Sequence, residues 1–396
     1  MKLGPSRSTN GRLKTCLLRS LLLLSLSLMS LPHFFPVSLA SPDSSSHTYE
    51  VMSYNVENLF DATHDKDMED WEFLPIDHPL KSNCGQISSP ANRKRCYRTD
   101  WTDEKMELKI SQIAKAILSE RATAPDMLGV VEIENKNVLK RLANKLGYQK
   151  YVITEGEDER GINVALLFNL NDHIKYQGYY QHTIDGDWFE EHPTRNILEV
   201  VFKINDRYPL SVFVNHWPAP QNPHAARVEA AKMLRTKILA RTKDDPNYRV
   251  VVVGDFNTVN TEYPNPVDEI LIGSDSSTFL SPSSLSPALT NVHSQYINDP
   301  QCDSSQLPPG TYYYTQEKVW NDLDKILVSS NMISSDMQSK GNAPQLLPCS
   351  FDIHNPRAIN NRYKNVFIPW RYNFSSENAD DAGFSDHYPL LFKFTL

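Results

Sequence analysis

The sequence predicts a protein of the α/β or α+β class. Short apolar runs rich in β-branched residues, which are typical of buried strands, recur from residue 49 to the end of the chain. Segments with apolar residues at helical spacing lie between several of these runs. Strands and helices in this order pack as layers.

The best-defined strands each have polar residues at one end. They cover residues 49–54, 126–131, 210–214, 249–254 and 323–328, and a last apolar run covers 390–394. We expect further strands near 151–154, 162–168, 197–204 and 312–315. Because sites in layered proteins form where strands reach the surface, the polar ends are the candidate functional positions.

Three segments predict amphipathic helices. The first has one apolar face made of Met106, Ile110, Ile113, Ala114, Ile117 and Leu118. The second covers 137–146, and the third covers 223–241 with Val228, Ala231, Leu234, Ile238 and Leu239 facing inward. Residues 273–309 are rich in Ser, Pro and Asp, which predicts a long loop.

Residues 1–40 are predicted to be a secretory signal peptide. They combine five basic residues with an apolar run over 17–31 and the small residues Ser38 and Ala40. An uncleaved anchor is the alternative, because Phe34 and Phe35 lengthen the apolar stretch. We expect residues 41–396 to form a single domain, since the strand-end motifs span the whole chain, with insertions near 61–103 and 264–307.

Removal of the leader makes the chain more acidic. The full chain has 40 Lys and Arg against 48 Asp and Glu, and the leader takes five basic and no acidic residues, which leaves a net charge of −13. Proteins that bind nucleic acid tightly are usually basic. The composition therefore disfavours a DNA-storage role but permits an enzyme with a locally positive, metal-loaded cleft.

Four cysteines follow the leader, namely Cys84, Cys96, Cys302 and Cys349. An even number in an exported chain favours two disulfides. Of the three connectivities, we predict the local pairs Cys84–Cys96 and Cys302–Cys349. Zinc is the competing interpretation, but the spacings fit no compact zinc motif.

The strand-end motifs supply groups suited to phosphoester chemistry. In chain order they are Asn55 and Glu57, Glu132, Asn215-His216-Trp217-Pro218, Asp255-Phe256-Asn257, Asp324, and Ser385-Asp386-His387-Tyr388-Pro389. An Asp-His pair at a strand edge can orient an imidazole and set its basicity. Hydrolysis of a phosphodiester needs a cation, a base, an acid and hydrogen-bond donors, and this set contains all four kinds of group.

These motifs, in this order, make the chain resemble the endonuclease/exonuclease/phosphatase superfamily, which includes DNase I and exonuclease III. The resemblance runs from about residue 49 to the C-terminus, with poor matches over 63–101 and 264–307. It is closest to the secreted bacterial-type branch, which has similar Asn-His-Trp-Pro, Gly-Asp-Phe-Asn and Ser-Asp-His-Tyr-Pro strings. The resemblance implies a four-layer sandwich of two packed mixed β-sheets flanked by helices.

The resemblance also implies roles for individual residues. It assigns the metal, Mg²⁺ with Mn²⁺ or Ca²⁺ as alternatives, to Glu132 and Asn55. Because side chains alternate along a strand, Glu57 lies on the same face as Asn55 if the strand continues, and we expect it to serve a second cation. Asp386 is expected to contact metal or water. Glu134 is expected to be a surface charge.

The catalytic residues implied are His387, His216, Asp255, Asn257 and Asp324. His387 is the expected general base, oriented by Asp324, and His216 the general acid for the leaving oxygen. Asp255 would orient the nucleophile or bind metal, and the Asn257 amide would donate to a phosphate oxygen.

The remaining candidates concern substrate contacts. Asn215, Arg195, Arg227 and Tyr312 are secondary candidates for phosphate or cleft contacts. An acidic residue usually steadies the histidine at the His216 position, and the expected region has Asn163 instead.

The sequence therefore predicts a monomeric, secreted or periplasmic, metal-dependent phosphodiesterase acting on DNA, or alternatively RNA, as a nonspecific endonuclease. A phosphomonoesterase or lipid phosphodiesterase of the same superfamily is the first alternative. Asp255-Phe256-Asn257-Thr258 and Leu323-Asp324-Lys325 depart from the strings of the inositol phosphatases, and Asn215-His216-Trp217 from that of the sphingomyelinases. A binding or toxin-like module that lost catalysis is the second alternative.

Overall fold

The computed structural model describes residues 47–273, 287–333 and 343–396. The chain divides into two compact units, Met1–Ser45 and Ser46–Leu396. The predicted leader lies outside the described residues, and the described residues all belong to the second unit. No helix in its described part is long and apolar enough to cross a membrane.

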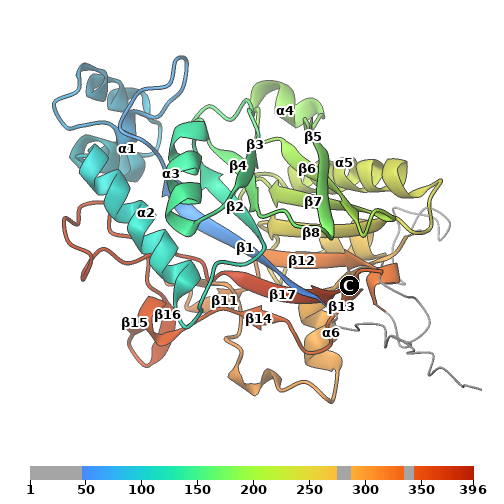
Figure 1. The fold of residues 1–396 in the computed structure, drawn as a ribbon. Coiled ribbons are helices and arrows are strands. Elements are labelled where there is room, and N and C mark those ends of the chain that lie inside the picture. The colour runs from blue at the N-terminus through green and yellow to red at the C-terminus, as the bar shows by residue number, and fades with distance from the viewer. Residues whose placement is uncertain (1–46, 274–286, 334–342) are drawn as a thin grey trace, which may run out of the picture. The chain divides into compact units, whose positions relative to one another are not determined.

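Two β-sheets form the centre of this unit (Figure 1). The first has the strand order β13-β17-β1-β2-β4-β3, with β14 also pairing with β17. Its strands are β1 (Thr48–Leu59), β2 (Met127–Ile133), β3 (Lys150–Ile153), β4 (Asn163–Phe168), β13 (Gln345–Leu346), β14 (Asp352–Ile353) and β17 (Leu390–Thr395). β1 and β2 are parallel and the other pairs are antiparallel, so the sheet is mixed.

The second sheet has the order β5-β6-β7-β8-β12-β9 and is also mixed, because only β7 and β8 are parallel. Its strands are β5 (Ile174–His182), β6 (Ile197–Ile204), β7 (Tyr208–His216), β8 (Arg249–Asp255), β9 (Leu289–Asn291) and β12 (Asp324–Ser329). Two hairpins complete the strands: β10 (Tyr312–Tyr314) with β11 (Val319–Asn321), and β15 (Asn360–Tyr363) with β16 (Val366–Pro369).

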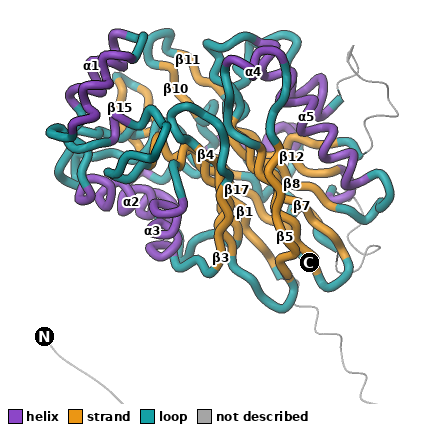
Figure 2. The backbone as a smooth tube through the Cα atoms, turned by 90° about the horizontal axis from the view of Figure 1, so that it is seen from above, coloured by secondary structure: helices purple, strands orange, loops and turns teal. Residues whose placement is uncertain are grey.

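Helices cover the outer faces of both sheets (Figure 2). α2 (Asp103–Leu118) and α3 (Lys136–Leu146) lie on the side of the first sheet, and α5 (His224–Thr242) lies on the side of the second. The other helices are α1 (Pro90–Arg98), α4 (Asp187–Glu191), α6 (Val292–Asn298), the π-helix Val267–Ile272, and short 3₁₀ turns at Trp71–Phe73, Pro79–Gln86, Ser304–Gln306, Ser330–Met332 and Arg357–Ile359. The predicted four-layer sandwich is confirmed.

Alternation along β8 explains the layering. Val251 and Val253 are buried in the core between the sheets, whereas Val250 and Val252 are buried against α5. Gly129 on β2 allows the sheets to approach, because a Cβ there would lie 2.9 Å from Val253 Cγ2.

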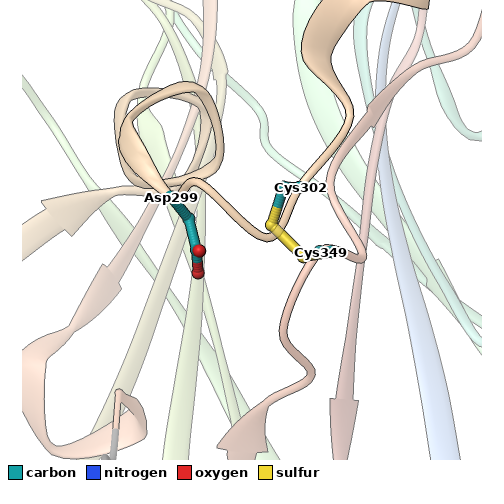
Figure 3. A group of neighbouring side chains, drawn as sticks. All are labelled: Asp299, Cys302 and Cys349. Carbon is teal, nitrogen blue, oxygen red and sulfur yellow. A yellow bond between two sulfur atoms is a disulfide. The ribbon is translucent and has the colours of Figure 1, made fainter.

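The two predicted disulfides are confirmed. Cys84 is bonded to Cys96 within the 61–103 insertion, and Cys302 is bonded to Cys349. Figure 3 shows the second bond beside Asp299. Because these sulfurs are bonded to each other, they are not thiolate ligands for zinc.

The prediction of one long loop over 273–309 is wrong in part. Residues 274–286 lie outside the described residues, but Leu289–Asn291 forms β9 and pairs with β12 in the second sheet. Helix α6 follows directly, with the Asn291 side chain capping its first turn. The predicted strand at 312–315 exists as β10, but it belongs to a hairpin and not to either main sheet.

Candidate active site

One cavity of about 1020 Å³ opens where the strand ends of both sheets meet. It is lined by most of the predicted site residues, namely Glu132, Arg195, His216, Asp255, Asn257, Tyr312, Asp386 and His387. The convergence follows from topology: β1, β2, β7 and β8 all run toward this edge, and Asp324, which begins the antiparallel β12, pairs with Asp255. Segments far apart in the sequence therefore supply one site.

Irregular backbone at the strand ends presents the side chains. The pairing of β1 with β2 shifts register after Asn55, and that of β2 with β4 shifts around Glu132, which has a φ of 64°. Asn257 has a φ of 52°. Gly254 has a φ of 132°, and a Cβ there would lie 2.0 Å from the Asn215 carbonyl oxygen. Such bulged, positive-φ positions re-aim side chains beside functional sites.

His387 and Asp324 form a buried pair. The His387 Nδ1 lies 2.7 Å from Asp324 Oδ2, and only 6% of the His387 surface is exposed. Its Nε2 is left facing the cavity, 3.9 Å from Asp255 Oδ2 and from Asp386 Oδ1. Burial disfavours the imidazolium, but the carboxylates of Asp324, Asp255 and Asp386 outweigh it and raise the pKa of His387 well above its usual value.

His216 lies near the Asp255 carboxylate, because it ends β7 beside Asp255 at the end of β8. Its Nε2 lies 3.9 Å from Asp255 Oδ2 and 3.7 Å from Glu132 Oε1, so these are its acidic neighbours. Asn163 does not steady it, because the Asn163 amide donates to the carbonyls of Glu134 and Gly161. Burial, reinforced by repulsion from Arg195, lowers the pKa of His216 well below its usual value. The pKa values of the two histidines are thus shifted in opposite directions.

The carboxylates in the cavity fit a hard divalent cation. Asn55 Nδ2 lies 3.1 Å from both Glu132 Oε1 and Asp255 Oδ2. Burial and the charge of Asp324 raise the pKa of Asp255, so a positive charge nearby would be strongly favoured. Carboxylate oxygens with neutral oxygen donors are the ligands that Mg²⁺ and Ca²⁺ prefer. Asp255, Asp324 and His387 also bring ligand atoms within 4.8 Å of one another.

Two predicted metal ligands are arranged differently from expectation. The Asn55 amide oxygen accepts a hydrogen bond from the Glu57 backbone N–H at 3.0 Å, and its nitrogen faces the carboxylates. Glu57 does not line the cavity. It is paired with Arg371, whose Nε lies 2.6 Å from Glu57 Oε1, and it accepts from the Tyr372 backbone N–H. This ion pair occupies Glu57 in place of the predicted second cation.

Arg195, Asn257 and Tyr312 lie in the cavity as predicted, each held by further contacts. Arg195 donates to Asp158 Oδ2 and to the Trp217 carbonyl, and Asn257 Nδ2 donates to the same carbonyl at 3.0 Å. Each still lines the cavity. The Tyr312 ring centroid lies 4.9 Å from that of His387, so Tyr312 forms a wall beside the imidazole.

The structure does not bring Asn215 or Arg227 to the cavity. Asn215 is fully buried, accepts from Trp217 Nε1 and donates to the Val253 carbonyl. Arg227 is paired with Glu262 and donates to the carbonyls of Ala219 and Asn222. These predictions of substrate contact are corrected: Asn215 packs the strand end, and Arg227 holds a loop that lines the cavity.

Several site residues were missed by sequence reasoning. Asp158 and Arg160 line the cavity, but they lie in a charged run that is typical of a solvated loop. Lys109 on α2 is fully buried, and Glu57 and Asp386 are among the charges that act on it. Glu134 was expected at the surface but is 1% exposed. No local pattern distinguishes these positions.

The chain belongs to the endonuclease/exonuclease/phosphatase family, whose model matches residues 89–395. Members of this family are hydrolases that act on phosphoester bonds, and they are generally dependent on divalent metals. No curated protein matches the chain.

Solved structures of similar fold include ANGEL2, a 2′,3′-cyclic phosphatase, at 16% identity with a TM-score of 0.50, covering 89% of this chain and 96% of that chain. A mannosyl-6-phosphatase of Bacteroides thetaiotaomicron is 15% identical, with a TM-score of 0.49 and coverage of 88% and 100%. The human nocturnin catalytic domain is 15% identical, with a TM-score of 0.48 and coverage of 88% and 97%. At these identities the likeness concerns the fold alone.

Proposed function

We propose that this protein is a metal-dependent phosphodiesterase that cleaves DNA as an endonuclease. The observation that carries the proposal is the pair of imidazoles, His387 and His216, each 3.9 Å from the carboxylate of Asp255 in one open cavity. Such a pair can place a base and an acid on opposite sides of one phosphate, as in-line displacement requires.

The chain's own residues provide the proton transfers. Asp324 accepts the Nδ1–H of His387 and so leaves Nε2 as the atom that takes a proton from an attacking water. His216 Nε2, which lies 3.9 Å from the same Asp255 Oδ2, serves the leaving oxygen. Asn257 and Arg195 supply donors for the charge that develops on the phosphate. A cation held by Glu132 and Asp255, with Asp386 beside them, would neutralise the phosphate and polarise its oxygen.

A basic groove next to the cavity favours a polynucleotide over a small monoester. The α1 groove, of about 440 Å³, is lined by Lys94, Arg95, Arg98 and Arg371. Glu72 and Glu57 also line it and pair with Arg95 and Arg371, which leaves Lys94 and Arg98 as its unpaired cations among the described residues. Arg371 also lies 3.6 Å from Asp386, which lines the cavity, so the two regions adjoin. Lys94 and Arg98 form no ion pair within the described part of the chain. In a chain of net charge −8, this local positive surface suits phosphates beyond the one that is cleaved.

We also propose that the protein is exported, with residues 1–40 as a cleaved signal peptide and a single following domain that acts as a monomer. The two disulfides support this proposal, because such bonds persist in oxidising compartments.

The experiment that tests the activity offers three substrates to the purified protein. Supercoiled plasmid, p-nitrophenyl phosphate and sphingomyelin are each incubated with Mg²⁺, Mn²⁺, Ca²⁺ or EDTA. Metal-dependent nicking of plasmid, with little turnover of the other two, is the expected result. Release of phosphate or phosphocholine with intact plasmid would contradict the proposal.

A further inference from the structure

A second group of carboxylates lies outside the catalytic cavity. Asp61, Asp65 and Asp70 follow the end of β1, and Glu134 lies between β2 and α3. We name these four residues the Asp61 cluster. None of them lines the cavity that holds His387.

The Asp61 cluster is buried and lacks basic partners. Asp61, Asp70 and Glu134 are only 4%, 2% and 1% exposed. In the described part of the chain, no Lys or Arg forms an ion pair with any of the four, and only His64 does, at 2.6 Å from Asp70. Several carboxylates buried together without cations are strongly unfavourable unless something neutralises them.

The amide of Asn135 faces more carboxylate oxygens than it can serve. Its nitrogen lies 3.1–3.2 Å from one oxygen each of Asp61, Asp65 and Glu134, yet an amide nitrogen has only two hydrogens. Its orientation is fixed, because the Asn135 oxygen caps α3 by accepting from the backbone N–H groups of Asn137 and Val138. Asp61 Oδ2 also accepts from Asn137 Nδ2 at 2.9 Å and Glu134 Oε2 from the Asp61 backbone N–H at 2.8 Å, which leaves Glu134 Oε1 as the buried oxygen of the cluster without a donor.

Glu134 carries the observation that points to a ligand. Its Oε2 accepts from the Asp61 backbone N–H at 2.8 Å, which places the carboxylate inside the cluster. Its Oε1 is buried and has no partner. A buried carboxylate oxygen without a donor is rare in folded proteins and calls for an ion or a proton.

We propose that the Asp61 cluster binds a hard divalent cation, Ca²⁺ in preference to Mg²⁺. Ca²⁺ accepts several carboxylates in irregular geometry, whereas Mg²⁺ keeps most of its waters and takes only one or two. The cation would join the loop after β1 to the β2–α3 connection. Glu69, in that same loop, lines the catalytic cavity, so the cation fixes one wall of the cavity without taking part in catalysis.

The test compares two carboxylate-to-amide variants of nearly unchanged shape. Protein stripped of metal is titrated with Ca²⁺, with bound Ca²⁺ measured by equilibrium dialysis and the melting temperature by scanning fluorimetry. Glu134→Gln is the test variant. Asp67→Asn is the control, because it removes the same charge from the same loop at a side chain that is 81% exposed.

Wild type and Asp67→Asn are expected to bind one Ca²⁺ per chain more than Glu134→Gln and to gain a Ca²⁺-dependent rise in melting temperature that Glu134→Gln lacks. Asp65→Asn, at a less buried position, replaces Glu134→Gln if the latter does not fold. Equal Ca²⁺ binding and equal stabilisation in test and control would overturn the proposal and indicate a protonated Glu134. Glu132→Gln separates the sites, since it should keep the Ca²⁺-dependent rise while losing metal-dependent hydrolysis.

Discussion

His387 depends on Asp324 both for its orientation and for its charge. The 2.7 Å contact fixes the ring, and the buried carboxylates around it raise its pKa although burial alone would lower it. A base must be neutral to accept a proton. Activity that uses His387 as base is therefore expected to rise with pH through the raised pKa of this residue.

Asp324→Asn is expected to move the acidic limb of the pH profile. Removal of this carboxylate removes an interaction that raises the pKa of His387, so the midpoint of the limb in kcat/KM should shift to lower pH while kcat falls. Hydrolysis rates from pH 5 to 9, at fixed metal and salt, measure the shift. A profile with reduced rate but an unmoved midpoint would show that Asp324 does not tune the base.

Glu132→Gln is expected to lower metal-dependent hydrolysis by roughly 10²-fold or more, because the proposed cation ligand at the cavity is lost. A titration of rate against Mg²⁺ concentration should show weaker metal binding with an unchanged melting temperature in EDTA. Wild-type metal dependence in this variant would exclude Glu132 as a ligand.

At the residue scale, the chemistry at strand ends was predictable from sequence because those side chains follow directly from the strand pattern. Asn215 shows the limit. It precedes His216 on one strand, so the two side chains point to opposite faces, and only His216 reaches the cavity. The burial of Glu134 and Lys109 could not be predicted from sequence, because it depends on segments distant in the chain.

At the element scale, the insertion near 61–103 has a defined structure. Its helix α1 begins at Pro90, is capped by the Ser89 side chain, and ends at Arg98. The Cys84–Cys96 bond ties this helix to the preceding 3₁₀ turn. The sequence predicted the bond but not the helix, whose basic residues give it no apolar face.

Replacement of Lys94 and Arg98 together by Ala is expected to raise KM for plasmid DNA and weaken its salt dependence. Each lost phosphate contact should lower the slope of log KM against log salt by about 0.9, while turnover of a mononucleotide diester stays unchanged. Lys140→Ala with Lys145→Ala on α3 is the matched control. Equal salt slopes in the two double variants would show that the α1 groove does not contact the DNA.

The short elements of the other insertion were also missed. β9 consists of three residues that follow a Ser- and Pro-rich stretch, and its strand conformation depends on pairing with β12. By contrast, the helix predicted at 137–146 was found at Lys136–Leu146, because its apolar spacing is regular and Asn135 caps it.

At the scale of the whole molecule, composition and periodicity predicted only layers of helices and strands. The prediction of a four-layer arrangement came from the family resemblance. Sequence pattern alone does not show that the two sheets pack face to face, because that packing depends on close contacts such as that of Gly129 with Val253. The site forms only when both parallel strand pairs end at one edge.

The disulfides should stabilise the whole fold unequally. Loop-closure entropy predicts a loss of up to about 4 kcal/mol when Cys302 and Cys349 are replaced by Ser, against about 3 kcal/mol for the Cys84 and Cys96 pair, because the enclosed separations are 47 and 12 residues. Urea unfolding of the two double variants measures both losses. A larger loss from the Cys84 and Cys96 pair would show that strain or local packing, not loop length, controls the effect.

We propose that the cavity around His387 hydrolyses DNA with the help of a divalent metal. The most direct measurement is the rate of plasmid nicking in Mg²⁺ by wild type, His387→Ala and His173→Ala, the last replacing a histidine outside the cavity. Wild type and His173→Ala should nick at equal rates that EDTA abolishes, and His387→Ala should be slower by roughly 10²- to 10⁴-fold. Nicking by His387→Ala at the wild-type rate, or nicking that persists in EDTA, would contradict the account.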